Sequence, residues 1–421
     1  MLTGCTSSPT TRASSHCVGG SSVSRGQSSI DPASPTLDAS AWSWVRTKDE
    51  LERLVRRLAL GSEIALDTEG DSLHHYPPRL SLVQIGVDTG EVWLVDSLAL
   101  PDLGPLAPIL AEPARLTVVH AGDNDLVHLK RRQGLRFTAL FDTSIAARFL
   151  GLRALGLDVL LVEYLGVQLP PSRQRDDWSA RPLSLAQERY AAADVQYLIP
   201  LKNRLVEELG RVGRLTWVEE ECQALAADPA LEPPPDPEAY ASLKGARELS
   251  ARGLAALRAL YQTRERLALE TGRPPFKIIS NETLLLVAAA LPRDVAALGT
   301  IAGFTPRAVQ RWGPDVLVAL EDAFDLPETE LPVLIRSPRP QIDAPTRRRF
   351  EALRAWRSTA APRLGLDPGV VLPNRLIGEV AGAAPRDRTG LARVAGLRHW
   401  RAEALGDEIL DTLARASSRS G

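Results

Sequence analysis

Four carboxylates on three separate segments are the residues of this chain that could carry out chemistry together. Asp67 and Glu69 alternate along one apolar stretch, so on a strand both side chains would project from one face. Asp125 follows another apolar stretch, and Asp194 comes four residues after Tyr190, a spacing that places two side chains on one face of a helix. Converging carboxylates repel one another and are tolerated where a cation neutralises them. Oxygen ligands suit Mg²⁺ or Mn²⁺, and two such ions can promote in-line cleavage of a phosphodiester.

Each of these segments also has a purely structural interpretation. The first pair could be a helix cap or a solvated pair at the edge of a loop. Asp123 suits the N-cap of the second segment's helix, which would leave Asp125 in the first turn, where the helix dipole favours a carboxylate. Tyr190 could be a core aromatic residue and Asp194 an exposed charge. The combination favours a metal site, and Asp125 has the weakest geometric support because Asp123 competes with it.

Apolar periodicity and turn residues predict the elements that must position these side chains. Short β-branched stretches predict strands at 64–68, 80–86, 92–95 and 116–119. Helical spacing predicts helices at 48–60, 123–132, 142–150, 157–165 and 184–209. Ser184 and Gln187 form a capping box at the start of the last helix. This order predicts an α/β domain in which helices flank a mixed sheet.

The remainder of the chain divides into tails, linkers and a repeat. Residues 1–40 are rich in Ser, Thr, Gly and Pro, and we expect disorder because they bury too little apolar surface to offset their ordering entropy. A shift of 93 residues aligns Gly272 with Gly365 and Asn281 with Asn374, which predicts two copies of one small all-α module. The predicted boundaries are 41–217 for the α/β domain, 218–240 and 324–340 for linkers, and 241–323 and 341–417 for the modules.

Composition limits the partners and the location of the protein. Hydrophobic residues make up 44% of the chain, and no apolar run approaches the roughly 18 residues of a membrane span, so we expect no membrane partner. Three cysteines without metal-ligand spacing favour a reducing, cytoplasmic compartment. The net charge is −2, but residues 336–421 carry 16 Arg and 9 Asp or Glu. Such a basic segment suits a polyanion, which makes the second module the better candidate for binding one.

The acidic segments resemble the three motifs of the DEDDy exonuclease superfamily, and of ribonuclease D and its relatives in particular. The residues that carry this resemblance are Asp67-Thr68-Glu69, His120-Ala121-Gly122 through Asp125, Asp142-Thr143, Trp178, Arg181-Pro182-Leu183, and Tyr190 through Asp194. The two repeated modules resemble HRDC domains, and the resemblance covers about residues 42–416. It implies a ribonuclease H-like fold and a 3′→5′ exoribonuclease that trims single-stranded RNA ends, including tRNA precursors, and releases nucleoside 5′-monophosphates.

The resemblance also assigns roles to individual residues. It implies that four acids hold two divalent metal ions, Mg²⁺ or Mn²⁺, and that a tyrosine positions the attacking water; these residues are Asp67, Glu69, Asp125, Asp194 and Tyr190. Candidates for contact with the substrate are His75, Tyr76, Arg175 and Trp178. A structural role in a loop is equally open for His75 and Tyr76, and Arg175 could instead be merely solvated. Asp71 stands where an apolar residue is common in the family, which puts the stacking of the terminal base in question.

Other functions remain open from the sequence alone. A DNA substrate would keep the same fold, because discrimination depends on recognition of the 2′-hydroxyl group. A non-catalytic nucleic-acid-binding protein is disfavoured by the complete set of acids and tyrosine. Gly70-Asp71-Ser72-Leu73 matches the nucleophile block of GDSL esterases, but Asp125 and His128, which have the spacing of the other triad members, lie in mid-domain. We expect a monomer.

Overall fold

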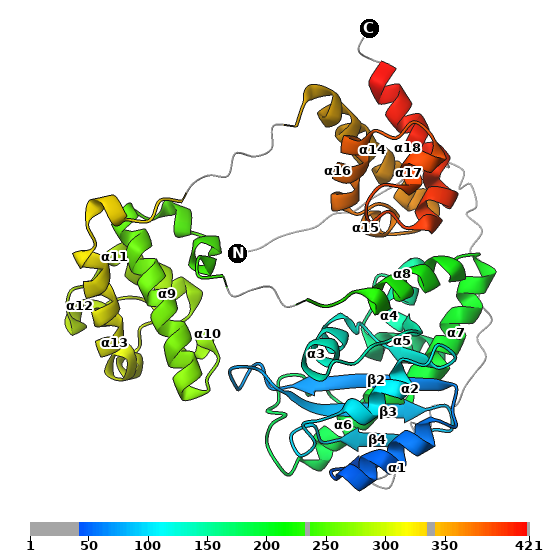
Figure 1. The fold of residues 1–421 in the computed structure, drawn as a ribbon, viewed down its shortest axis with the longest axis horizontal. Helices are drawn as coiled ribbons and strands as arrows, with labels where there is room; N and C mark the ends of the chain where they lie inside the picture. The colour runs from blue at the N-terminus through cyan, green and yellow to red at the C-terminus, as the bar shows by residue number, and fades with distance from the viewer. Residues whose placement is uncertain (1–41, 232–235, 335–341, 419–421) are drawn as a thin grey trace, which may run out of the picture. The chain divides into compact units, whose positions relative to one another are not determined.

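The computed structural model describes residues 42–231, 236–334 and 342–418 (Figure 1). The disorder predicted for residues 1–40 falls outside these ranges. The described chain contains an α/β domain followed by two helical modules, and each is considered by itself below. No helix in the described ranges is both long enough and apolar enough to cross a membrane.

A mixed sheet forms the centre of the α/β domain, as the sequence predicts, and it has six strands where the sequence predicts four. Its strands are β1 (Ser43–Val45), β2 (Glu63–Gly70), β3 (Leu80–Val87), β4 (Val92–Val95), β5 (Leu116–Val119) and β6 (Leu140–Asp142). The strand order is β1-β4-β3-β2-β5-β6, with β3 antiparallel to both β2 and β4 and the other pairs parallel. Strand β2, which carries Asp67 and Glu69, therefore lies inside the sheet, where both its faces can be covered.

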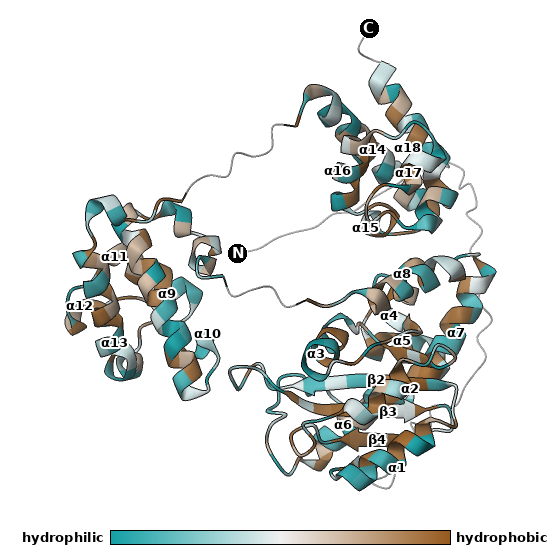
Figure 2. Ribbon diagram, viewed as in Figure 1, coloured by the Kyte–Doolittle hydropathy of each residue, from teal (hydrophilic) through white to brown (hydrophobic). Residues whose placement is uncertain are grey.

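Helices cover both faces of this sheet. The helices of the domain are α1 (Lys48–Leu58), α2 (Ala107–Leu110), α3 (Asp123–Gln133), α4 (Thr143–Phe149), α5 (Leu157–Leu165), α6 (Leu185–Gln196), α7 (Leu198–Arg211) and α8 (Leu215–Ala227), with a 3₁₀ turn at Gly104–Leu106. Leu51, Leu54 and Leu58 of α1 pack with Leu66 of β2 in one core cluster. On the opposite face, Ala65 of β2 packs with residues of α6 and α7. The strands β3 and β4 are accordingly apolar along much of their length (Figure 2).

Several predicted boundaries in the α/β domain differ from those observed. The helix predicted at 184–209 is two helices, because Pro200 has no N–H to donate and its ring would clash with the preceding turn of a continuous helix. The predicted linker begins at 218, but α8 continues to Ala227 and buries Cys222, whose sulfur accepts a hydrogen bond from the Asp142 backbone N–H. Strands β1 and β6 escaped prediction because three residues are too few to show periodicity.

The predicted repeat is confirmed, since the helix bounds of the two modules differ by 93 residues throughout. The first module contains α9 (Ala251–Thr271), α10 (Pro275–Ile278), α11 (Asn281–Ala290), α12 (Val295–Gly299) and α13 (Pro306–Asp325). The second contains α14 (Ala344–Leu364), α15 (Pro368–Val371), α16 (Asn374–Ala383), α17 (Arg388–Ala392) and α18 (His399–Ser418). Short 3₁₀ turns occur at Ala239–Ser242, Ala246–Glu248 and Glu328–Glu330.

An internal brace is repeated as well. In the first module Arg264 donates to the Asn281 side-chain oxygen at 2.6 Å, and in the second Arg357 donates to that of Asn374 at 2.8 Å. The conserved spacing of Arg and Asn in the two copies therefore reflects one tertiary contact rather than a binding motif.

Candidate active site

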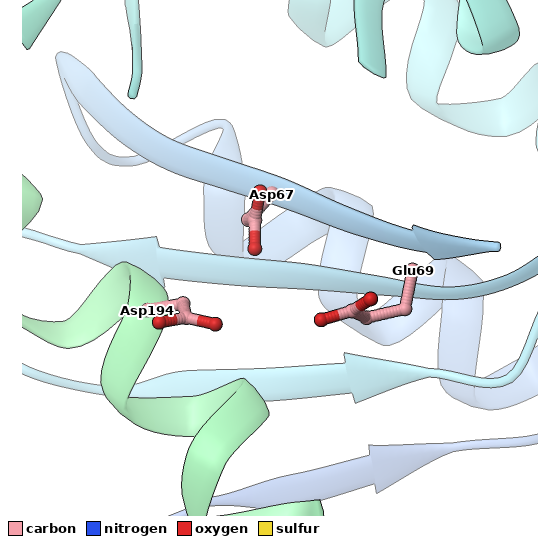
Figure 3. A group of neighbouring side chains, drawn as sticks. All are labelled: Asp67, Glu69 and Asp194. Atoms are coloured by element: carbon pink, nitrogen blue, oxygen red, sulfur yellow. The ribbon is translucent and has the colours of Figure 1, made fainter. Parts of the chain in front are cut away.

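Three of the four predicted acids meet on one face of the sheet. Ligand oxygens of Asp67, Glu69 and Asp194 all lie within 4.8 Å of one another (Figure 3). The first two come from β2, where alternation puts both on the face that α6 covers, and the third comes from α6 itself. Within the described chain, no Lys or Arg forms an ion pair with any of them.

Small residues allow α6 to approach the sheet closely enough to complete this group. Ala191, Ala192 and Ala193 are all buried. Gly86 of β3 lies beneath the same helix, and a Cβ atom there would stand 3.1 Å from the Val195 carbonyl oxygen. The capping box of Ser184 and Gln187 begins the helix, as predicted. These local features set the height of Asp194 above the strand.

The fourth acid, Asp125, approaches from α3 and lies outside the group of three. Its carboxylate accepts a hydrogen bond from the Thr68 hydroxyl group, which lies between the two acids of β2. Asp123 is exposed and is the first residue of α3, and the N-cap is Gly122, which makes no side-chain capping bond. The proposed capping role of Asp123 is therefore wrong, and Asp125 is the acid of this segment that reaches the site.

Asp142 holds the turn that leads to α3. Its carboxylate accepts from the backbone N–H groups of Ala121 and Gly122, and from two N–H groups at the start of α4. Gly122 has no room for a side chain, because a Cβ atom would lie 2.7 Å from a methyl group of Val119. The sequence marks Asp142 only by its likeness to the family, and its capping role becomes visible in the fold.

The electrostatics of the site are those of an unbalanced acidic cluster. Burial, followed by repulsion from Asp194 and Asp125, raises the pKa of Glu69 to about 9. Burial raises the pKa of Asp194 to about 7, although interaction with Tyr190 lowers it in part. Burial and the neighbouring acids also raise the pKa of Asp67, and burial raises that of Asp125. This is the behaviour of carboxylates that a bound cation would neutralise.

Tyr190 stands beside the acids, where the sequence places it. Burial and the charges of Asp194, Glu69 and Asp67 raise the pKa of its phenol above the ordinary value, so the hydroxyl group stays protonated. Its ring packs against Trp178, with the ring centroids 6.1 Å apart. The Trp178 side chain is fully buried, and its predicted contact with substrate stays a prediction. The structure gives Trp178 the role of supporting Tyr190.

The loop between β2 and β3 holds two other predicted substrate residues. The His75 ring nitrogen Nε2 lies 2.8 Å from the Ser179 hydroxyl oxygen. The His75 side chain is half-buried and already has this partner. Arg175 is exposed, and only its carbonyl oxygen is engaged, by His74 at 3.0 Å. Of the four predicted substrate residues, Arg175 alone has an exposed side chain.

Asp71 closes this loop. Its carboxylate accepts from the Arg79 backbone N–H at 2.6 Å and from the Arg79 guanidinium at 2.9 Å, and it is fully buried. The departure from the family pattern therefore has a structural cause. Ser72 next to it is exposed, and no described His or acid is hydrogen-bonded to its hydroxyl group, so the esterase alternative has no triad.

Comparisons with known proteins agree with this geometry. A family model described as 3′–5′ exonuclease matches residues 42–210, and one described as HRDC domain matches residues 253–320 and 346–413. A ribonuclease D of Pseudomonas paraeruginosa is 33% identical over 89% of this chain and 98% of its own length. One of Gluconacetobacter diazotrophicus is 38% identical over 68% and 73% respectively. The crystal structure of Escherichia coli ribonuclease D matches with a TM-score of 0.64 and 28% identity, covering 89% of this chain and 99% of that one.

The mixed sheet with its acidic cluster, followed by two HRDC domains, defines a 3′→5′ exonuclease with a tandem helical extension. Because relatives of more than 30% identity align over most of both chains, the chain belongs to the ribonuclease D family of 3′→5′ exoribonucleases.

Proposed function

We propose that this enzyme hydrolyses the 3′-terminal phosphodiester of single-stranded RNA, including tRNA precursors, in a reaction that requires two Mg²⁺ or Mn²⁺ ions. The observation that carries the proposal is the group formed by Asp67, Glu69 and Asp194, with which no described Lys or Arg forms an ion pair. Oxygen-only donors fit a hard divalent cation. Together with Asp125, these acids would hold the ions, which supply a Lewis acid for the phosphoryl oxygens and lower the pKa of water.

The remaining residues of the site would orient the reaction. The protonated Tyr190 hydroxyl group can donate to Asp194 and accept from a water molecule, which orients that water toward phosphorus. Water adds to phosphorus, the P–O3′ bond breaks, and the penultimate nucleotide keeps its 3′-oxygen. The products are a shortened RNA and a nucleoside 5′-monophosphate. Arg175, exposed in the loop before α6, is a candidate for contact with phosphate.

The test is digestion of a 5′-labelled single-stranded RNA with Mg²⁺ or Mn²⁺, with the products separated by length. We expect stepwise shortening of the RNA that stops when chelator is added. In Asp194→Asn the rate of shortening should fall at least about a hundredfold, which corresponds to about 2.8 kcal/mol of the barrier at about 1.4 kcal/mol for each factor of ten. The exposed acid Glu52 provides a control, because Glu52→Gln should cut normally. Full activity in Asp194→Asn would refute the assignment, and equal digestion of a matched DNA end would favour the DNA alternative.

We further propose that the first HRDC domain provides a surface for the RNA backbone. A pocket on it is lined by Arg273, Lys277, Arg307 and Arg311, which are all exposed, and by Phe276 with 53% of its surface exposed. No ion pair involves these four cations within the described ranges. An uncompensated basic surface next to an exposed ring suits phosphates and unstacked bases.

The second HRDC domain lacks this surface despite its larger count of arginines. At the positions equivalent to the four cations it has Leu366, Val370, Trp400 and Ala404. Several of its arginines are engaged internally, as in the ion pairs Arg363–Glu408 and Arg388–Asp407. The exposed, unpaired cations thus favour the first module as the one that binds the RNA backbone, whereas the count of charged residues favours the second.

Salt dependence tests this surface. Replacing Lys277 and Arg307 together by Ala should weaken RNA binding and reduce the slope of log K against log salt by about one for each lost phosphate contact. Arg388→Ala in the second module is the matched control and should keep the slope. An unchanged slope in the double variant would exclude the surface. A cytoplasmic location and a monomeric state stay predictions.

A further inference from the structure

A buried glutamine in the middle of the sheet, Gln84, has no role in the proposed reaction as described so far. Gln84 of β3 is fully buried, and neither its amide nitrogen nor its amide oxygen has a hydrogen-bond partner among the described residues. Leaving such groups unsatisfied costs about 1–3 kcal/mol each. An unmet polar side chain on a covered face of the sheet needs a reason, because Leu or Val would pack there without this cost.

The strand register places this glutamine next to a predicted metal ligand. Asp67 of β2 pairs with Gln84 of β3 in the antiparallel ladder. Directly opposed residues of an antiparallel pair project to the same face, with Cβ atoms roughly 5 Å apart. The flanking pairs follow the same alternation: Glu69 lies opposite Leu82, which packs with Tyr190. The Gln84 side chain therefore lies on the face of the acidic group, in the layer beneath α6.

We infer that Gln84 is a positioning residue whose side-chain amide donates a hydrogen bond to the Asp67 carboxylate when the site holds its cations. The inference rests on the proposed metal-dependent function. A carboxylate has more acceptor positions than a cation occupies, and a donor on the remaining lone pairs fixes its orientation. Gln84 provides an NH₂ group for this purpose without adding a charge. The Thr68 hydroxyl group provides a comparable support for another predicted ligand, because it donates a hydrogen bond to the Asp125 carboxylate.

The amide oxygen of the same side chain also needs a donor. Trp178, which packs with Leu82 and Tyr190 over this face, has a buried indole N–H without a partner. The described residues on this face thus include an unmet indole donor on Trp178 and an unmet amide on Gln84. If the Gln84 amide oxygen accepts from the Trp178 indole N–H while its NH₂ group donates to Asp67, the residue that packs against Tyr190 is connected to the orientation of the Asp67 carboxylate.

The test compares Mn²⁺ binding, measured by calorimetry on the full chain, in the wild type and in Gln84→Met, which keeps the length of the side chain and removes the amide. We expect the Kd for Mn²⁺ to rise about 10–100-fold, the range seen when a partner of a metal ligand is removed. The rate of RNA trimming should recover when Mn²⁺ is raised in proportion. The melting temperature in chelator should be unchanged or higher, because a buried unmet group has been removed.

Thr117→Val is the matched control. Thr117 is also fully buried on this sheet with an unpartnered hydroxyl group, but it belongs to β5 and pairs with Ile64, whose side chain lies on the other face. This variant should keep the wild-type affinity for Mn²⁺. Equal affinity in the wild type and Gln84→Met would overturn this inference and leave the proposed function intact. A wild-type chain that binds no Mn²⁺ would overturn both.

Discussion

Replacing Glu69 by Gln should make the protein more stable when no metal is present. The carboxyl group of Glu69 is largely buried beside Asp67 and Asp194. Burial, together with the charges of Asp194, Asp125 and Asp176, raises its pKa to about 9 from an ordinary value of 4.5. The group is therefore protonated in the folded chain near neutral pH and ionised in the unfolded chain. Folding must take up this proton, and Gln removes that requirement while keeping the shape of the side chain.

The size of the effect follows from the difference in pKa. At about pH 7.5 the proton uptake costs at most about 4 kcal/mol, at roughly 1.4 kcal/mol for each unit between the unfolded-state pKa and the pH. The repulsion is shared among neighbouring acids, so we expect Glu69→Gln to recover about half of this cost. That gain corresponds to a rise in melting temperature of about 4–8 °C for a domain of this size. The sign follows from linkage. A raised folded-state pKa means that stability is lost as the pH rises from about 4.5 to about 9, so the gain should shrink toward about pH 5.

Scanning calorimetry in chelator and then in Mn²⁺ provides the measurement. In chelator, Glu69→Gln should melt at a higher temperature than the wild type. The control Glu52→Gln, which changes an exposed acid on α1, should melt at the same temperature as the wild type. In Mn²⁺ the difference in melting temperature between Glu69→Gln and the wild type should shrink or change sign. The wild type keeps all its metal ligands, so it gains more stability from an ion that binds only the folded state. A Glu69→Gln chain that melts below the wild type in chelator, with an equal Mn²⁺-induced shift in both, would refute the reasoning.

Three other substitutions test how the site is built. Tyr190→Phe should lower the rate of RNA trimming by roughly 10²–10⁴-fold while keeping the Mn²⁺-induced thermal shift, since it removes a group that orients water and no metal ligand; an unchanged rate would exclude that role. Gly86→Ala should displace α6, because the new Cβ would stand 3.1 Å from the Val195 carbonyl oxygen, and should weaken Mn²⁺ binding in calorimetry more than Gly210→Ala, whose Cβ meets nothing within 4 Å. Arg181→Ala should cost about 3 kcal/mol in urea unfolding, because it leaves the buried Asp96 without the partner that donates at 2.7 Å; a loss below about 1 kcal/mol would show that the pair contributes little.

The sequence was sufficient to predict the four inner strands of the sheet and the three acids that meet on one of its faces. Strands β4 and β5 and the helix α5 begin and end where apolar runs and turn residues place them. Alternation along β2 correctly puts Asp67 and Glu69 on one face, and the capping box at Ser184 correctly starts the helix that carries Asp194. These features depend on local chemistry, on which a pattern of a few residues is informative.

Features that depend on tertiary contacts were beyond this reach. The burial of Trp178 depends on the path of the loop before α6, and the caps made by Asp142 join segments about twenty residues apart. The choice between Asp123 and Asp125 was open because a helix start can shift by one residue, which changes the acid that faces Thr68. Local propensity contains no information on any of these contacts.

The two HRDC domains show where fold and function separate within one chain. Their helices have the same bounds after a shift of 93 residues, and the brace of Arg264 with Asn281 is repeated by Arg357 with Asn374. Selection on the fold alone would keep these positions, whereas the exposed cations around Phe276 have no counterpart in the second copy. A duplicated module can keep its core and lose or gain a surface independently, because core contacts and exposed charges contribute separately to stability. The two copies therefore differ in their surface residues rather than in their fold, and the proposed contact of the first copy with RNA rests on those residues.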